Sequence, residues 1–448
     1  MTIAQRLAAA ALHARPGAAM REMAERLVLD AGGLCVGARG ETYVAAAIAS
    51  AEGEGQATAI GHPRGMTAAD AALVNGTAAH GEDYDDTFEG GPVHAGAVVV
   101  PAVLAVAERF GLPGAAAFAG IAAGSEATCR LSTVIPKAVH KAGFHPTSVF
   151  GAMGAALGVG VALKLDEARL AHALGIAGSF ASGIIEYLAD GSWTKRVHPG
   201  WAAQAGLRAV LLAREGFIGP ATVFEGKHGL FQGFAHSAEG NWGALLDGFG
   251  ERWIAETIAF KPYACGTMIH PYIDCARRLA ARGIAPERIV SVTCETAEGI
   301  LHRLWEPLDF KRAVPNAYAA KFSVPYGIAA GFILDGAYLD AFTEERVADP
   351  RLRALSAKVS YVVDPANPYP KAFTGHVRLR LDDGTEIEER QPHFRGGASE
   401  PLTRAELEAK CIANCRHGGW SEEQARGLLA FAASVFDAPR VDASALRG

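Results

Sequence analysis

The chain has 448 residues, of which 50% are hydrophobic and 20% are charged, so its composition excludes a disordered protein. The 52 glycines and 22 prolines follow no fixed period, which excludes a collagen-like chain. The formal net charge of −6 excludes a broad basic surface for nucleic acid or anionic lipid, so an anionic ligand requires a local cluster of Lys, Arg or His.

Cysteine usage and hydropathy favour a cytoplasmic protein without a membrane segment. The seven cysteines are sparse and form no CxxC pair, which is typical of a reducing compartment. We interpret Cys411 and Cys415, four residues apart on a predicted helix, as small buried side chains. The N-terminus has no signal-peptide pattern, and the longest segment without Lys, Arg, Asp or Glu, residues 142–163, contains Pro146 and many glycines.

The N-terminal part of the chain, up to residue 263, is rich in Ala and has the apolar periodicity of helices. Helices are predicted over residues 21–30, 101–110, 149–163, 166–182 and 202–215. The first should end at Gly32-Gly33, a plausible helix C-terminus. So many Ala and Gly inside periodic segments indicate helices that cross closely through small residues.

The pattern changes near Ala264 to a mixture of strands and helices. Strands are predicted over 288–296 and 357–363, a β-hairpin over 376–390 with Asp383-Gly384 at its turn, and helices over 272–282 and 324–335. This is the pattern of an α+β module.

A helical pattern returns near the C-terminus. Thr403 and Glu406 have the spacing of a capping box, and helices are predicted over 407–415 and 422–435. We therefore predict a mainly α fold, with a large all-α domain (residues 1–263 and 398–448) interrupted by a smaller α+β domain (residues 264–397).

The densest group of polar residues is the segment from Asn75 to Thr87, followed by His94. Asp83 and Asp86 recur at helical spacing with Asn75, so one face carries an amide and carboxylates. Acidic groups between apolar helices are costly to bury alone and need a partner, a metal or a ligand. The alternative is that Asp85 or Asp86 caps a helix.

Further polar groups occur at the ends of predicted apolar helices. In the segment 143–148, Thr147 or Ser148 is a candidate N-cap, and His145 lies beside that anion-attracting end. The segment 190–200 is expected to be a polar loop. The remaining candidates are four cations, two histidines and a tyrosine in three segments: Lys195, Arg196, His198, Lys261, His270, Lys321 and Tyr326.

Two kinds of site compete for these residues. Asp83, Asp85, Asp86 and His94 would suit Mg²⁺ or Mn²⁺, but no HxH or HxxxH pair is present. The cationic clusters instead suit a polycarboxylate held by charge-assisted hydrogen bonds. The chain has no GxGxxG after a strand, no Walker A motif and no GxSxG elbow, so a nucleotide cofactor and a hydrolase nucleophile are not indicated.

Taken together, these segments resemble the MmgE/PrpD family, which contains 2-methylcitrate dehydratases, cis-aconitate decarboxylases and iminodisuccinate epimerases. The similarity spans nearly the whole chain and rests on segments in family order: 75–87 with His94, 143–148, 194–200, Gly219-Pro220 with Glu225-Gly226, 261–270 and 321–326. The resemblance implies a helical domain and a smaller α+β lid, a homodimer, and cofactor-free chemistry in a cleft.

The resemblance also assigns residues by position. Residues that line the cleft in the decarboxylase branch are matched by Asp83, Thr87, His94, His145 and Lys195, a lid tyrosine by Tyr326, and a histidine near the domain junction by His270. The sequence departs from the family pattern in one extra residue between Thr87 and His94, in Ala95 where many members have Pro, and in Gly266 where relatives often have Cys or His. These departures put the substrate in doubt.

The chemistry common to the family is removal of a proton, or of carbon dioxide, next to a carboxylate. We predict His94 and His145 as the acid/base pair, with Lys195 as an anchor for the substrate carboxylate. Asp83 would orient a histidine or hold a substrate hydroxyl, and Tyr326 would bind or donate to a substrate oxygen. Substrate contacts are further expected from Thr87, Asp86, Arg196, His198, His270, Lys261 and Lys321, with no metal and no cofactor.

The sequence therefore predicts a lyase on a small di- or tricarboxylate. The first hypothesis is a dehydratase similar to 2-methylcitrate dehydratase, an enzyme of propionate metabolism. The alternatives are decarboxylation of a cis-aconitate-like substrate or epimerisation through the same carbanion, and a non-catalytic protein that binds polycarboxylates. The expected partners are a small-molecule substrate and a second copy of the chain, without nucleic acid or membrane.

Overall fold

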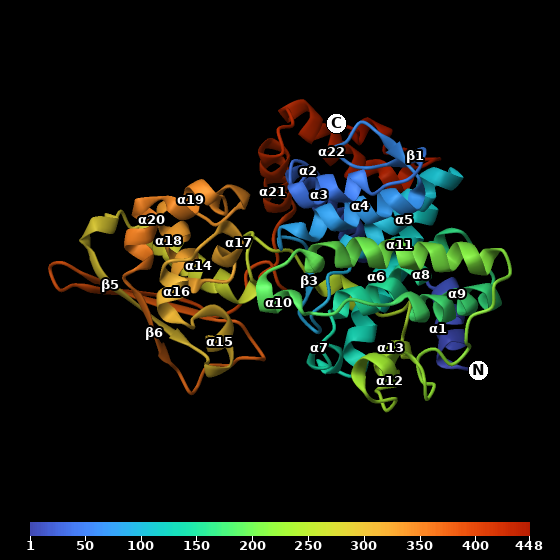
Figure 1. Cartoon of the computed structure of the whole chain (residues 1–448), viewed down its shortest axis with the longest axis horizontal. Helices are drawn as coiled ribbons and strands as arrows, with labels where there is room; N and C mark the ends of the chain where they lie inside the picture. Colours follow the sequence, from blue (N-terminus) through green and yellow to red (C-terminus); the bar gives the residue numbers. More distant parts are fainter. The chain divides into compact units, whose positions relative to one another are not determined.

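The structure, a computed structural model, describes all 448 residues and consists of two compact units (Figure 1). Unit 1 comprises Met1–Phe260 and Thr403–Gly448, and unit 2 comprises Lys261–Leu402. The predicted mainly α character is present, since most elements of the chain are helices. No helix is long and apolar enough to cross a membrane.

Unit 1 is a bundle of long helices with a few short strands. Its helices are α1 (Ile3–His13), α2 (Ala18–Gly37), α3 (Thr42–Ala49), α4 (Ala68–Gly81), α5 (Gly96–Phe110), α6 (Gly114–Val134), α7 (Ala138–Lys141), α8 (Pro146–Ala162), α9 (Glu167–Phe180), α10 (Tyr187–Asp190), α11 (Thr194–Arg214), α12 (Leu230–Ala235), α13 (Trp242–Leu246), α21 (Arg404–His417) and α22 (Glu422–Ser434). Unit 1 also contains two short antiparallel pairs, β1 (Glu54–Thr58) with β2 (Gly65–Met66) and β3 (Thr87–Phe88) with β4 (Ile258–Ala259).

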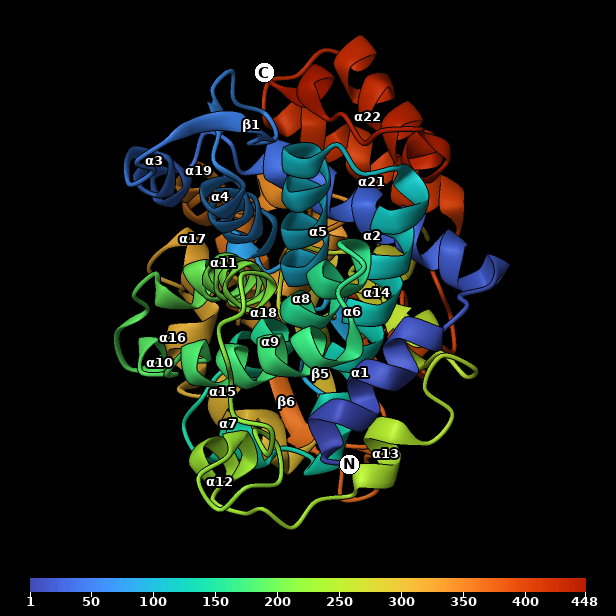
Figure 2. The same cartoon turned by 90° about the vertical axis from the view of Figure 1, so that its right-hand side faces the viewer.

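Helix α8 is the centre of this bundle. It packs against α5, α6, α9 and α11, as Figure 2 shows, and nearly all its residues are buried. A helix that is apolar around its whole circumference is stable only when neighbours cover every side. The sequence 146–162 therefore requires this central position.

Small residues set the distance between crossing helices, as the composition predicted. A Cβ atom added at Gly200 of α11 would lie 2.1 Å from the carbonyl oxygen of Leu73 on α4. A Cβ atom at Gly76 of α4 would lie 2.6 Å from the Cα atom of Gly200. The two backbones are therefore in contact, which brings the start of α11 to the C-terminal part of α4.

The predicted end of the first helix at Gly32-Gly33 is wrong, because α2 continues to Gly37. The two glycines serve a helix crossing instead of a C-cap. A Cβ atom at Gly33 would lie 3.0 Å from Sγ of Cys411 on α21, and one at Gly32 would lie 2.8 Å from Leu428 on α22. The C-terminal helices thus pack directly on α2, with Cys411 and Cys415 buried as predicted.

Unit 2 contains a four-stranded sheet in the order β6-β5-β7-β8. The strands are β5 (Ile289–Thr296), β6 (Val359–Val363), β7 (Gly375–Leu381) and β8 (Glu386–Gln391), and only the β5–β6 pair is parallel. The predicted hairpin is confirmed: Val377 pairs with Cys294 on one side and Glu389 on the other, and Gly384 has a φ of 83° at the turn.

Two helices of unit 2, α14 (His270–Ala280) and α18 (Val324–Ile333), pack against each other, and α14 also contacts β7 and β8. The shorter helices are α15 (Leu301–Leu304), α16 (Leu308–Arg312), α17 (Ala317–Ala320), α19 (Glu344–Ala348) and α20 (Pro350–Ser356). After this unit the chain re-enters unit 1 through the predicted capping box, in which Thr403 caps α21 together with Glu406.

Candidate functional site

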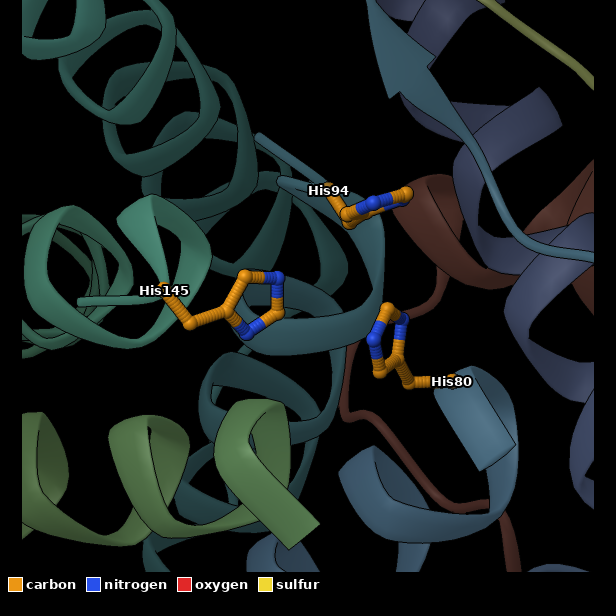
Figure 3. Close-up of side chains that lie close together, drawn as sticks. All are labelled: His80, His94 and His145. Carbon is orange, nitrogen blue, oxygen red and sulfur yellow. The ribbon is translucent and has the colours of Figure 1, made fainter. Parts of the chain in front are cut away.

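Three buried histidines from separate segments of unit 1 converge on one point (Figure 3). Their ring centroids are 4.8 Å apart for His80 and His94, 5.6 Å for His80 and His145, and 6.3 Å for His94 and His145. His80 lies in the last turn of α4, His94 just before α5, and His145 at the start of α8. The packing of three helix ends therefore creates a cluster of imidazoles.

His80 was not predicted as a site residue. Its Nδ1 atom lies 2.8 Å from Oδ2 of Asp85, and both side chains are almost fully buried. A carboxylate accepts hydrogen bonds, so Nδ1 of His80 carries the proton and Nε2 remains for exchange. The signal in the sequence was a single imidazole in an Ala-rich helix five residues before a carboxylate, within the polar segment already identified.

His94 is held by the backbone and by the same carboxylate. Its Nδ1 atom lies 2.6 Å from the carbonyl oxygen of Asp86 and 3.4 Å from Oδ2 of Asp85. A carbonyl oxygen only accepts, so Nδ1 of His94 also carries a proton. The backbone N–H of His94 donates to Oγ1 of Thr147 at 3.3 Å, which ties this loop to α8.

Asp86 caps the start of α5. The sequence had left open whether it is a helix cap or a carboxylate of the site. Its Oδ2 atom accepts a hydrogen bond of 3.0 Å from the backbone N–H of Gly96 in the first turn of α5. Burial, and next the neighbouring Asp85, raise the pKa of Asp86 well above its usual value. Asp86 therefore fixes the loop that carries His94, and its predicted role in substrate binding stays a prediction.

His145 pairs with another histidine, His198. The two Nδ1 atoms are 3.2 Å apart, so one ring donates to the other. Burial, with the charges of neighbouring groups such as Lys195, lowers the pKa of His145 well below its usual value and that of His198 to about 4. Both rings are thus neutral near pH 7, as a general base requires.

The structure corrects two local predictions around this pair. The N-cap of α8 is His145 itself, followed by Pro146 in the first turn, and not Thr147 or Ser148. Proline favours that first position because its missing N–H is not needed there. The segment expected as a polar loop starts α11 at Thr194, so Lys195, Arg196 and His198 occupy its first turns.

Lys195 and Asp83 form an ion pair, with Nζ and Oδ1 2.8 Å apart and both side chains mostly buried. Asp83 has a φ of 54°, in the left-handed region that non-glycine residues rarely adopt. Such strain persists where surrounding contacts fix the residue, and it is frequent at functional sites.

Arg196 and Thr87 lie near this ion pair in the sequence but make other contacts. The guanidinium of Arg196 lies 3.5 Å from Glu82 and 4.3 Å from the ring centroid of Tyr43. Thr87 is half-buried and pairs with Ala259 in the β3–β4 ladder. Their predicted contacts with substrate stay predictions.

The sequence matches the MmgE/PrpD N-terminal domain over residues 2–242 and the MmgE/PrpD C-terminal domain over residues 263–434. The chain belongs to the MmgE/PrpD family. This confirms the resemblance that the polar segments and their order indicated.

Three similar proteins all carry the name cis-aconitate decarboxylase. A cis-aconitate decarboxylase of Mus musculus is 30% identical over 362 residues, which cover 77% of this chain and 71% of the relative. The cis-aconitate decarboxylase of Aspergillus terreus is 29% identical over 406 residues, covering 82% and 79%. That of Homo sapiens is 29% identical over 365 residues, covering 77% and 72%.

Four predicted residues of this MmgE/PrpD protein belong to unit 2, and all four are buried. Nε2 of His270 lies 3.0 Å from the carbonyl oxygen of Cys265, and Nζ of Lys321 lies 3.2 Å from that of Ala264. The Tyr326 hydroxyl donates to the Ala341 carbonyl at 2.5 Å, and burial raises its pKa. Lys261 precedes these residues in the chain. Their contribution to the histidine cluster of unit 1 stays a prediction.

The three-histidine cluster of this MmgE/PrpD chain is also a candidate metal site. One nitrogen from each of His80, His94 and His145 falls within a spread of 4.8 Å. Two nitrogens on one zinc ion are at most about 4.2 Å apart, since each Zn–N bond is about 2.1 Å. The rings would have to move closer to hold zinc. The acidic alternative for Mg²⁺ uses carboxylates that already bind Lys195, His80 and the start of α5.

Proposed function

We propose that this protein is a cofactor-independent lyase that decarboxylates a small tricarboxylate similar to cis-aconitate. The observation that carries the proposal is the buried cluster of His80, His94 and His145, in which Asp85 holds the first two, in a chain similar to cis-aconitate decarboxylases. Dehydration of 2-methylcitrate, the first hypothesis from sequence, becomes the second candidate.

Decarboxylation of such a substrate needs a sink for electrons and a source of one proton. The C–C bond to the departing carboxylate breaks, carbon dioxide leaves, and the electron pair spreads over the allylic carbons and a remaining carboxylate. A proton is then added to carbon, so one proton is consumed for each carbon dioxide released. The Lys195 ammonium would stabilise the developing negative charge more than the ground state.

An imidazole that has taken up a second proton from solvent would supply that proton and would be protonated again by solvent after each turnover. His94 and His80 each hold Nδ1–H toward a fixed acceptor, so proton exchange with a substrate occurs through Nε2. His145 is neutral near pH 7, because burial and then the charges of neighbouring groups, among them His80 and Lys195, lower its pKa. We assign the acid/base steps to His94 and His145, as predicted, and add His80 as the third imidazole of the centre.

Substrate contacts in the proposal follow the family resemblance. Lys195 would exchange its contact with Asp83 for a substrate carboxylate, while Thr87 and His198 would bind other substrate oxygens. Unit 2 would act as a lid that contributes Lys261, His270, Lys321 and Tyr326. Because each methylene changes binding by only about 1–3 kcal/mol, small differences in such contacts decide the substrate.

Dehydration stays the second candidate for a specific reason. Loss of a β-hydroxyl needs a base for the carbon-bound proton and an acid for the leaving oxygen, and several imidazoles with fixed tautomers supply both. Epimerisation needs only proton removal and return. A protein that merely binds polycarboxylates needs the cations but no acid/base centre.

Product analysis of the purified protein in D₂O separates these candidates. The protein is incubated with cis-aconitate, 2-methylcitrate, citrate or iminodisuccinate and followed by NMR. Carbon dioxide with an itaconate-like product supports the proposal. An unsaturated acid from 2-methylcitrate indicates dehydration, and deuterium uptake without net conversion indicates epimerisation. Saturable binding without turnover of any substrate would contradict an enzyme, and loss of activity with EDTA would contradict a metal-free site.

We also propose that the protein is a homodimer, as the resemblance implies. Apart from Met1, the large apolar side chains of unit 1 that are exposed all fall between residues 184 and 218: Ile184, Leu188, Trp193, Trp201, Leu212, Phe217 and Ile218. A second copy of the chain that covered this segment would remove these side chains from water. Light scattering at micromolar concentration should give twice the mass of one chain, and replacement of Trp201 and Phe217 by Ser should give monomers.

A further inference from the structure

A buried ion pair joins two helices of unit 1 that are distant in the sequence. Nζ of Lys410, on α21, lies 2.7 Å from Oδ1 of Asp30 on α2. Both side chains are less than one-tenth exposed. A charge that is removed from water is stable only beside a close partner. Replacement of one member of this pair alone would therefore leave an uncompensated buried charge and lower the stability of the fold.

The same ammonium group binds the segment that carries the site carboxylates. Nζ of Lys410 donates to the carbonyl oxygen of Tyr84 at 2.7 Å and lies 3.9 Å from the centroid of the Tyr84 ring. Tyr84 stands between Asp83, the partner of Lys195, and Asp85, the partner of His80. One C-terminal side chain therefore holds the backbone between these two carboxylates.

A close helix crossing brings Lys410 to this position. Gly33 lies one turn after Asp30 on α2, and a Cβ atom there would lie 3.2 Å from the Cα atom of Cys411, the residue after Lys410. The glycine that sequence reasoning took for a helix end thus allows α21 to approach.

The charge of Lys410 also matters to the carboxylates around the site. Asp30 is one of the groups that raise the pKa of Asp86, so the carboxylates of Asp30, Asp85 and Asp86 interact electrostatically. The ammonium group balances part of this negative charge. Without it, the protonated forms of nearby imidazoles would be favoured.

We propose that Lys410, paired with Asp30, is a positioning residue of the active site: it fixes the Tyr84 backbone so that Asp85 holds His80 and His94 in register. The proposal rests on the function proposed above. Lys410 does not contact the substrate. It acts through Asp83 and Asp85, whose placement decides where the imidazoles and Lys195 point.

The kinetic test replaces Lys410 by Met and by Arg. Lys410→Met should lower kcat by about 10–100-fold with KM changed less than threefold, because a displacement of about 1 Å in a catalytic group can cost that much. The pH profile of kcat should move to higher pH, since loss of a positive charge favours protonated imidazoles. Lys410→Arg keeps the charge and should recover most of kcat. An unchanged kcat and pH profile in folded Lys410→Met would overturn the proposal.

Two further variants separate positioning from stability. Lys410→Met/Asp30→Asn removes both charges, so it should unfold at a higher temperature than Lys410→Met while its kcat stays low. Recovery of kcat in this double variant would overturn the proposal. Glu108→Gln is the matched control, because Glu108 also ties the C-terminal segment, at Ala443, to the N-terminal part of unit 1, at Thr58, but lies at the other end of α5 from His94. It should lower stability and leave the pH profile unchanged.

A structural measurement keeps this test distinct from that of the proposed function. If the wild type turns over no polycarboxylate, the proposed function fails, and crystal structures of the wild type and of Lys410→Met decide the positioning role. The proposal expects the 2.8 Å contact between Nδ1 of His80 and Oδ2 of Asp85 to lengthen or break in the variant. An undisturbed contact would overturn it.

Discussion

Asp85 holds His80 through a hydrogen bond of 2.8 Å between Oδ2 and Nδ1, in a place where both side chains are at most 2% exposed. The same oxygen lies 3.4 Å from Nδ1 of His94. One carboxylate thus orients two imidazoles from the ends of two helices. Their Nε2 atoms are the ones that can exchange protons with a substrate.

Asp85→Asn should leave the fold intact and lower kcat by about 10²–10⁴-fold, with little change in substrate affinity. An amide can present its NH₂ group to His80 and so reverse the tautomer that the carboxylate fixes. Steady-state kinetics and calorimetric titration with substrate measure the two effects separately. A variant with wild-type kcat would show that the tautomer of His80 has no part in turnover.

Lys195→Met should lower kcat/KM by about 10²–10³-fold, because it removes the cation that stabilises charge in the transition state. Lys195→Arg should retain intermediate activity, since the charge stays and its geometry changes. The double variant Lys195→Met/Asp83→Asn controls for the carboxylate left without its ion pair. Equal kcat/KM in wild type and Lys195→Met would remove Lys195 from the mechanism.

Gly200→Ala should lower the free energy of unfolding by about 1–3 kcal/mol, because its Cβ would lie 2.1 Å from a backbone oxygen of α4. Gly427→Ala on α22 is the matched control, since no atom lies within 4 Å of a Cβ there. It should raise the free energy of unfolding by about 0.5–1 kcal/mol. Urea denaturation compares them, and equal stability of Gly200→Ala and wild type would contradict the close crossing.

His198 should make the folded state less stable in acid. Its pKa is about 4 in the folded protein against 6.5 for an ordinary histidine, so the unfolded chain binds more protons between these values. The stabilising difference is complete above pH 6.5 and is lost as the pH falls toward 4, by up to about 3 kcal/mol at about 1.4 kcal/mol per unit.

Urea denaturation of the wild type and His198→Gln between pH 4 and 7.5 measures this contribution. The difference between the two proteins cancels titrations that His198 does not influence, including that of Asp86, whose raised pKa acts in the opposite direction. It retains the coupling of His198 with its neighbour His145. The wild type should lose stability faster than the variant below pH 6.5. Parallel curves would mean that His198 is not held neutral by its surroundings.

Much of the fold follows from local patterns in the sequence. The hairpin of β7 and β8 has a turn signal and alternating residues, and the capping box at Thr403 has both of its side chains in place. Periodicity located α5, α8 and α9 to within a few residues except at the N-terminal end of α5. Glycine was harder to interpret, because Gly33 serves a crossing with α21 that no local pattern reveals.

The sequence predicted those site residues that stand in a recognisable polar segment. It did not predict residues whose role depends on contacts between distant segments. His94, His145, Asp83 and Lys195 were predicted from polar segments and their family order. The structure places His94 beside His145 and pairs Lys195 with Asp83, while the roles of these residues stay predictions. His80 was missed because its importance comes from rings contributed by other helices. Lys410 was not predicted for the same reason, since its partners Tyr84 and Asp30 lie more than 300 residues away in the chain.

The most direct measurement is decarboxylation of cis-aconitate in D₂O by the wild type and by His145→Ala, with product NMR and calorimetric titration in parallel. We predict that the wild type releases carbon dioxide and places one deuterium on carbon, and that the variant binds substrate with similar affinity but turns over at least about 100-fold more slowly. Undiminished turnover by the variant would contradict an acid/base centre built from these imidazoles.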